Sequence, residues 1–246
     1  MNLAAPVDWL LNVGTTPYWP ELRAETSTLC VLQHGLIRSA CSLVRLQRTL
    51  LRHGYAVLNR SYPSVWDTIE AHAERLHASL ERRLFRDGTA AQPPRLCYLG
   101  HSMGGLVVRA CLARADARAA DTCLFLATPQ RGAALARVRH SFPPLRIVLG
   151  RNAPRQLIPG DPLYARLPAV TARRIGVIYG RRGDGRGWNR HLAGDDDGTV
   201  AVAEALLPEA HDQIGLRYGH TRITTAPAVL RQVLVFLRHG RFEHAD

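Results

Sequence analysis

The feature of this sequence that most restricts its fold is the alternation of short apolar runs with longer stretches of helical periodicity. Runs of strand length occupy residues 28–33, 55–59, 95–99, 122–126 and 175–179, and a weaker one occupies 212–216. Apolar runs separated by helices are typical of a parallel sheet that helices cover on both faces. The pattern therefore predicts an α/β fold with a reduced, mostly parallel sheet of about six strands.

Helical periodicity fills most of the intervals between these runs. A leucine repeat ending before Gly54 predicts one helix, and a capping-box pair of Ser64 and Asp67 predicts that a longer helix begins at Ser64. Pro227 suits the first position of the last helix, which should stop before Gly240. The expected helices span about residues 43–51, 64–84, 106–115 and 227–239.

The length of 246 residues, with 46% apolar side chains, suits one domain over residues 1–246. Residues 1–27 contain no convincing strand pair and are treated as an N-terminal extension. Residues 129–170, rich in proline, glycine and arginine, are expected to form an irregular, lid-like insertion with one short helix near 145–149. The apolar stretch 142–149 could line an acyl pocket or simply pack over the edge of the sheet.

The charge is unusual but does not indicate nucleic-acid binding. The formal net charge is +12, and all 32 basic residues are arginine. These arginines are scattered, and the chain has no recognised nucleic-acid motif and no basic segment interleaved with aromatic residues. The sequence therefore predicts no nucleic-acid partner. The charge is compatible with weak peripheral attraction to an anionic membrane or an anionic substrate.

The cysteines and the hydropathy pattern bear on location. None of the five cysteines has the spacing of a metal ligand, and Cys30, Cys97 and Cys123 fall inside apolar strand-like runs. Core thiols of this kind fit a reducing compartment, so a cytoplasmic location is expected. The sequence shows no secretory signal and no apolar run of the ~18 residues needed to span a bilayer, so any membrane contact should be peripheral.

The strongest chemical signal is a G-x-S-x-G motif at residues 100–104, read as Gly-His-Ser-Met-Gly. It follows a predicted strand and precedes a predicted helix, which is the context that a nucleophile elbow requires. A sharp strand-to-helix turn would force Ser102 into an unfavourable backbone conformation and present its hydroxyl at a helix N-terminus, where negative charge is stabilised. Gly105 should relieve crowding between helix and strand. We therefore expect Ser102 to be a catalytic nucleophile.

A second signal lies at the end of the first apolar run, where residues 33–36 read Gln-His-Gly-Leu. An acyl-transferring serine needs backbone N–H donors for the oxyanion, one from the residue after the nucleophile and one from a loop after an early strand. Those positions predict an oxyanion hole made by Met103 and Leu36. Gly35 would let the backbone approach the substrate, and His34 would brace the loop without titrating.

The sequence resembles the α/β-hydrolase superfamily, and within it the small lipase/esterase-like serine hydrolases. Three stretches carry this resemblance: LQHGLIRS, YLGHSMGGLVVR, and GDDDGTV with the GHT that follows it. The resemblance covers about residues 28–240. It implies a catalytic triad in the chain order serine, acid, histidine, and a reaction through an acyl-enzyme with no metal or organic cofactor.

The resemblance selects the acid and the base. The D-G-x-V element of lipase-like relatives maps to Asp197, with Asp196 as the alternative acid. Three adjacent aspartates could also be a solvated or ion-binding turn, although they lack the spacing of a recognised calcium loop. His220, 23 residues beyond Asp197, follows the sixth run and is the expected base. His211 is the competitor, but it precedes that run and would sit at the wrong end of the sheet.

The sequence thus predicts a serine ester hydrolase, of the carboxylesterase or lipase class, with the triad Ser102, Asp197 and His220. Its substrate would be a small-molecule ester or an acyl lipid. Two alternatives share the fold. An acyltransferase would differ only in excluding water from the acyl-enzyme, and a non-catalytic binding protein would carry an idle triad.

Overall fold

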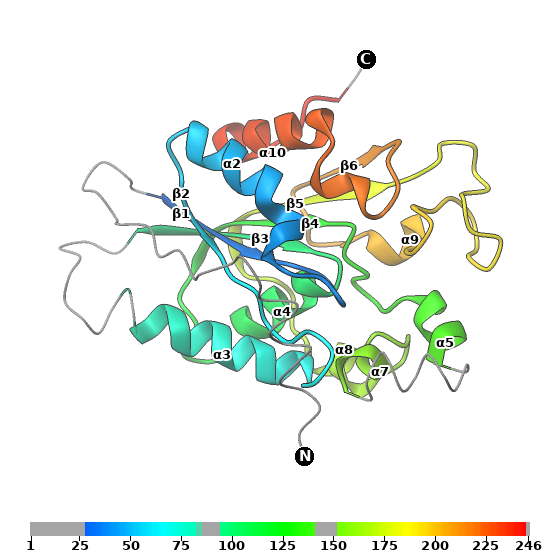
Figure 1. Ribbon diagram of the computed structural model, residues 1–246, viewed down its shortest axis with the longest axis horizontal. Coiled ribbons are helices and arrows are strands. Elements are labelled where there is room, and N and C mark those ends of the chain that lie inside the picture. Colours follow the sequence, from blue (N-terminus) through cyan, green and yellow to red (C-terminus); the bar gives the residue numbers. More distant parts are fainter. Residues whose placement is uncertain (1–27, 83, 85–93, 141–151, 245–246) are drawn as a thin grey trace.

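The structure is a computed structural model and describes residues 28–82, 84, 94–140 and 152–244. Within these residues the six strands form one sheet in which every pair of neighbours is parallel (Figure 1). The α/β prediction with a reduced six-stranded sheet is therefore confirmed. The strand order across the sheet is β2 (Ala56–Asn59), β1 (Thr28–Gln33), β3 (Arg95–His101), β4 (Ala120–Leu126), β5 (Ala172–Gly180) and β6 (Asp212–Leu216).

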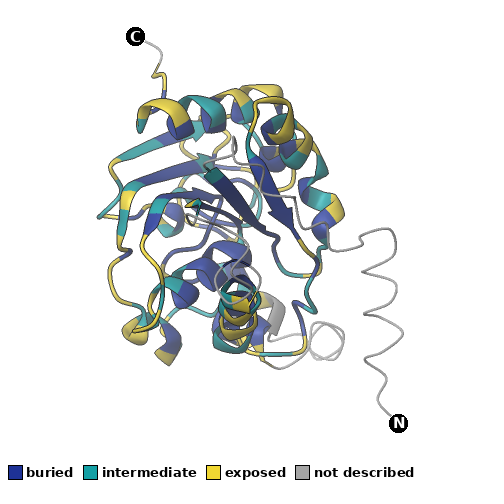
Figure 2. Ribbon diagram, turned by 90° about the vertical axis from the view of Figure 1, so that its left-hand side faces the viewer, coloured by how far each residue is buried: buried dark blue, intermediate teal, exposed yellow. Residues whose placement is uncertain are grey.

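Alternate residues of each strand supply two separate cores. In β1, Leu29 and Val31 join the core under α3 (Ile69–Glu81) and α4 (Met103–Leu112), while Cys30 and Leu32 join the core under α2 (Val44–Arg52) and α10 (Pro227–His239). Figure 1 shows α2 and α10 on one face of the sheet and α3 and α4 on the other. Figure 2 shows the strands buried between them. Helices on both faces explain why these strands are apolar along their whole length.

The start of α3 differs from the prediction. The helix begins at Ile69 and is capped by Thr68, whose hydroxyl accepts the backbone N–H of Ala71. Ser64 cannot form the predicted capping box, because its buried hydroxyl accepts the backbone N–H of Ile37, in the loop after β1. Asp67 instead forms an ion pair with Arg75. The predicted pair thus connects other parts of the fold. The α-helical part of α3 ends at Glu81, and Arg82 and Leu84 continue it as π-helical backbone, so the predicted end near residue 84 agrees with the structure.

The region between β4 and β5 is more helical than the sequence suggested. Its described residues contain α5 (Ala134–His140), α7 (Ala153–Gln156) and α8 (Pro162–Arg166). Prolines in the first turn suit α7 and α8, and the Asp161 carboxylate caps α8 by accepting the N–H of Leu163. The helix expected near 145–149 and the N-terminal extension 1–27 lie outside the described residues.

The remaining elements are short and surround the end of the sheet where the strands finish. They are η1 (Ala40–Leu43) after β1, α9 (Val202–Ala205) between β5 and β6, and η3 (Arg222–Thr224) after β6. Gly240 ends α10 with a left-handed backbone, φ 72°, as its sequence position suggested. Of the helices that the structure describes, none combines the length and apolarity needed to cross a bilayer.

The junction of β3 with α4 is the most crowded part of the backbone. A Cβ atom added at Gly100 would lie 2.4 Å from the Cα of Gly105, and one added at Gly104 would lie 2.2 Å from the carbonyl oxygen of Gln33. A Cβ added at Gly105 would lie 2.1 Å from Thr128 Oγ1. Because these three glycines have no side chain, α4 can pack against β3, the end of β1 and the loop after β4 more closely than any other residue would allow.

We expect Gly105→Ala to lower the free energy of unfolding by about 1–3 kcal/mol, because the added methyl group overlaps the Thr128 side chain in a close-packed region. Urea unfolding of the purified protein measures this change. In a double-mutant cycle the loss should shrink in a Thr128→Ala background, where the clashing Oγ1 and Cγ2 are gone. Strictly additive losses would show that the steric explanation is wrong.

Candidate active site

Ser102 stands at the sharp turn between β3 and α4. Its backbone has φ 54° and ψ −128°, in the positive-φ region that L-residues rarely occupy. The turn is held by a hydrogen bond of 2.9 Å from the Ser102 N–H to the carbonyl oxygen of Leu126 in β4. This strained geometry is the one that the G-x-S-x-G motif predicted for residue 102. It places the hydroxyl at the N-terminus of α4, beside backbone N–H groups that lack an intrahelical acceptor.

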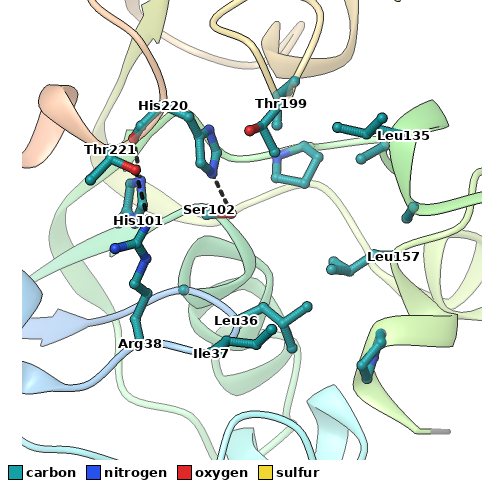
Figure 3. A pocket seen from close by; sticks show the side chains of 16 residues that line it. Leu36, Ile37, Arg38, His101, Ser102, Leu135, Leu157, Thr199, His220 and Thr221 are labelled. Carbon is teal, nitrogen blue, oxygen red and sulfur yellow. Dashed lines mark hydrogen bonds between the residues drawn. The ribbon is translucent and has the colours of Figure 1, made fainter. Parts of the chain in front are cut away.

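His220 lies in the loop after β6 and reaches across to Ser102. Its Nε2 is 2.9 Å from Ser102 Oγ, and its Nδ1 is 2.7 Å from Asp197 Oδ2 (Figure 3). A carboxylate can only accept a hydrogen bond, so Nδ1 carries the proton and Nε2 is free to accept the proton of the serine hydroxyl. The structure thus brings the three sequence-predicted side chains into one continuous hydrogen-bonded chain.

The three adjacent aspartates have distinct partners. Asp197 is buried, and while its Oδ2 faces His220, its Oδ1 accepts the backbone N–H groups of Thr199 and Val200. The backbone also fixes the imidazole, since the His220 N–H donates to the Asp197 carbonyl oxygen at 2.8 Å. Of the aspartates in this turn, Asp197 is therefore the one placed to orient His220.

The neighbouring aspartates hold the preceding loop. The Asp196 carboxylate is buried and accepts the backbone N–H groups of Trp188, Asn189 and Gly198. The Asp195 carboxylate accepts those of Arg182 and Gly183. The alternative acid, Asp196, thus has a structural partner set and does not face the imidazole.

His211 lies at the opposite end of the sheet from Ser102. It immediately precedes β6, and its Nδ1 accepts the backbone N–H of Ile175 near the start of β5. Parallel strands carry their C-terminal ends to one edge of the sheet, so a residue before β6 cannot reach a residue after β3. His211 therefore lies away from Ser102, and His220 is the histidine that contacts the serine hydroxyl.

A cavity of about 200 Å³ opens beside Ser102 (Figure 3). Arg38 and Thr221 lie on the side of the cavity near His220, and Leu135 and Leu157 lie on the opposite side. The rest of the lining is mostly apolar and comes from the loop after β1, the loop after β4, α5, α7 and the loop after Asp197. These residues include Leu36, Ile37, Pro129, Ala133, Ala136, Pro154 and Val200.

The predicted oxyanion donors lie next to this cavity. Leu36 lines it, and Met103 is the buried first residue of α4, directly after Ser102. The approach of the Leu36 loop to the elbow is close, since a Cβ added at Gly35 would lie 3.0 Å from the Cβ of Ser102. The absence of a side chain at Gly35 therefore gives the loop its access to the serine, and the oxyanion role of both N–H groups stays a prediction.

No protein-family model and no curated protein matches the chain, but solved structures do. The mature form of the lipase BlEst2 from Bacillus licheniformis aligns over 92% of this chain and 96% of its own, with 18% identity and a TM-score of 0.62. The metagenomic carboxyl esterase MGS0156 aligns over 82% and 68%, with 18% identity and a TM-score of 0.55. A putative hydrolase of the alpha/beta superfamily from Xanthomonas campestris aligns over 85% and 98%, with 14% identity and a TM-score of 0.51. This chain has the α/β-hydrolase fold.

Within this α/β-hydrolase fold, His34 braces the loop after β1, as the sequence suggested. It is fully buried, its Nδ1–H donates to the Gly35 carbonyl oxygen, and its Nε2 accepts the N–H of Tyr62. The His34 imidazole and the Tyr62 ring stack with their centroids 4.2 Å apart. Burial lowers the pKa of His34 to about 4, so the imidazole stays neutral near pH 7. The Gly35–Leu36 backbone is thus held without a charged group.

His101 has a supporting position that the sequence analysis did not assign. It is buried beneath His220, and its Nε2–H donates to the His220 carbonyl oxygen at 2.9 Å. Burial first, and then the nearby His220, keep the pKa of His101 well below its usual value. The sequence around His101 does not indicate this role, because the hydrogen bond to His220 joins residues that are 119 positions apart in the chain.

We expect the free energy of unfolding to fall as the pH drops from about 6.5 toward 4. The unfolded chain protonates His34 and His101 near pH 6.5, whereas the folded chain resists protonation of His34 until about pH 4 and of His101 until well below its usual value. Over that window the unfolded state binds more protons, and each histidine contributes a slope of up to about 1.4 kcal/mol per pH unit.

Urea unfolding at pH 7.5, 6.0 and 5.0 measures this slope. His34→Gln should make it shallower, while the same change at the exposed His191 should not. Equal slopes for wild type and His34→Gln would contradict the assignment.

Proposed function

We propose that this protein is a serine hydrolase that cleaves carboxylic esters through an acyl-enzyme intermediate. The observation that carries the proposal is the hydrogen-bonded chain from Ser102 Oγ through His220 to Asp197, with distances of 2.9 and 2.7 Å, at the edge of a largely apolar cavity. The lipase and the carboxyl esterase among the structural neighbours support the same chemistry.

The geometry suggests the role of each group in the first half of the reaction. His220 Nε2 takes the proton of Ser102 as its oxygen attacks the ester carbonyl carbon, and Asp197 stabilises the imidazolium that forms. The N–H groups of Leu36 and Met103 would bind the developing oxyanion, a contribution of about 3 kcal/mol for each donor. The imidazolium then gives its proton to the departing alcohol oxygen, and the acyl group remains on Ser102.

The second half of the reaction repeats these steps with water. His220 removes a proton from a water molecule that attacks the acyl-enzyme, and the proton returns to Ser102 as the carboxylic acid leaves. The Leu135 and Leu157 side of the cavity would receive the acyl chain, because it is the apolar wall farther from His220 (Figure 3). No group beyond this chain's own residues and water is needed for these steps.

A fluorophosphonate probe and a p-nitrophenyl ester series test the nucleophile. We expect Ser102→Ala to abolish labelling and to lower kcat on p-nitrophenyl butyrate by about 10⁴-fold or more, since the attacking oxygen is gone. Ser79→Ala, on α3 and outside the cavity, is the matched control and should label like wild type. Labelling that persists in the Ser102→Ala variant would refute the site.

The two buried aspartates provide a matched pair for the acid. Asp197→Asn should lower kcat by about 10⁴-fold, because an amide can favour the wrong imidazole tautomer. Asp196→Asn should act mainly on stability, since its carboxylate holds backbone N–H groups and does not face His220. Steady-state kinetics together with Tm values separate the two effects. A folded Asp196→Asn variant as inactive as Asp197→Asn would contradict the assignment.

A further inference from the structure

Arg38 places a positive charge inside the cavity of the proposed site. It follows Ile37 in the loop after β1, and its Nη2 donates to Thr221 Oγ1 at 2.7 Å (Figure 3). The side chain is half-buried and lines the same cavity as Ser102. Because Thr221 is the residue after His220, this hydrogen bond ties the guanidinium to the loop that carries the imidazole.

Among the described residues that line the cavity, Arg38 is the only arginine. Several arginines have a carboxylate within ion-pair distance, whereas over the described residues Arg38 has none. No Asp or Glu appears among the described residues that line the cavity, since Asp197 is buried behind His220. A half-buried cation without a counter-ion raises the local potential and attracts an anionic group of a ligand.

The guanidinium also has donors to spare. It carries five N–H groups in a planar fork, and the contact with Thr221 uses one of them. Such a fork matches the paired oxygens of a carboxylate or a phosphate, and hydrogen bonds between two charged groups are about twice as strong as neutral ones. A single oxyanion-bearing substituent on the substrate would therefore supply the missing counter-ion.

The position of Arg38 decides which half of an ester would carry that substituent. His220 must protonate the departing alcohol, so the leaving group lies on the His220 side of Ser102. Arg38 is held on that side through Thr221, and the apolar wall of Leu135 and Leu157 is opposite (Figure 3). An acyl chain against the apolar wall would thus direct the alcohol half toward the guanidinium.

We propose that the site prefers esters whose alcohol half carries a carboxylate or phosphate group, and that Arg38 binds this group. The inference rests on the proposed ester hydrolysis. The reaction itself is unchanged. The ester C–O bond breaks, the proton from His220 passes to the alcohol oxygen, water completes the acid, and the anionic substituent leaves intact on the alcohol.

Two pairs of butyryl esters test the preference and separate the two anions. 3-Butyryloxybenzoate is compared with 3-butyryloxybenzamide for a carboxylate, and 1-butyrylglycerol 3-phosphate with 1-butyrylglycerol for a phosphate. The readout is the ratio of kcat/KM for the anionic ester to that for its neutral partner, so that general losses of activity cancel. We expect wild type to favour the anionic member of at least one pair by 5-fold or more, and the pair that responds identifies the anion.

Four variants assign the preference to the guanidinium. Arg38→Gln should lower the selectivity ratio at least 5-fold, and Arg38→Lys should lower it less because the charge remains. Thr221→Val removes the hydrogen bond that holds the guanidinium but leaves the cation, so it should lower the ratio by less than Arg38→Gln does. Arg48→Gln makes the same charge change on the exposed side of α2 and should leave the ratio as in wild type.

The outcomes separate this inference from the proposed function. If wild type hydrolyses the neutral esters through Ser102 but shows a ratio near or below one in both pairs, the anion preference is wrong. An Arg38→Gln variant with the wild-type ratio, or an Arg48→Gln variant with an equal loss, would also overturn it. If neither member of any pair is hydrolysed and the fluorophosphonate does not label Ser102, the proposed function itself fails.

Discussion

The strained turn at Ser102 is the constraint on which the rest of this structure depends. The positive φ angle of a residue with a side chain is unfavourable by itself, and it persists only because the surroundings over-determine it. Here the Ser102 N–H is tied to Leu126, and Gly100, Gly104 and Gly105 remove the side chains that would otherwise separate β3, α4 and the adjoining loops. The hydroxyl is thereby fixed at a helix N-terminus before any substrate arrives.

The parallel sheet then assembles the rest of the site around that hydroxyl. Loops that follow β1, β3, β4, β5 and β6 all leave from the same edge, because parallel strands end together. Hence Leu36, Ser102, Pro129, Asp197 and His220 meet, although they are far apart in the chain. The two apolar cores above and below the sheet hold the strands in register, and that register sets where each loop begins.

The buried groups that support Ser102 and His220 include two neutral histidines. His34 and His101 brace the two loops as neutral imidazoles, the first through Gly35 and the second through the carbonyl oxygen of His220. The buried carboxylate of Asp197 is surrounded by donors, from the imidazole and from two backbone N–H groups. The guanidinium of Arg38 is the only arginine side chain among the described residues that line the cavity, and the proposed anion preference rests on it.

Much of the fold followed from local patterns. Strand-length apolar runs gave the six strands, and the motif at residues 100–104 located the strained serine, because steric limits at a strand-to-helix turn act over a few neighbouring residues. The sequence was less reliable where a side chain had a choice of partners. Ser64 could cap a helix or bind a distant backbone N–H, and the distant contact with Ile37 prevailed.

What the amino-acid sequence by itself determined was the class of fold and the strained turn at Ser102, and the order of the acid and the histidine along the chain followed from the resemblance to the α/β-hydrolase superfamily. The tertiary structure decided which of two adjacent aspartates faces His220, that His101 supports the histidine loop, and that Arg38 enters the cavity. Each of these depends on contacts between residues far apart in the chain. Such contacts are set by the packing of the sheet and its loops, so the pattern of neighbouring residues in the sequence does not predict them.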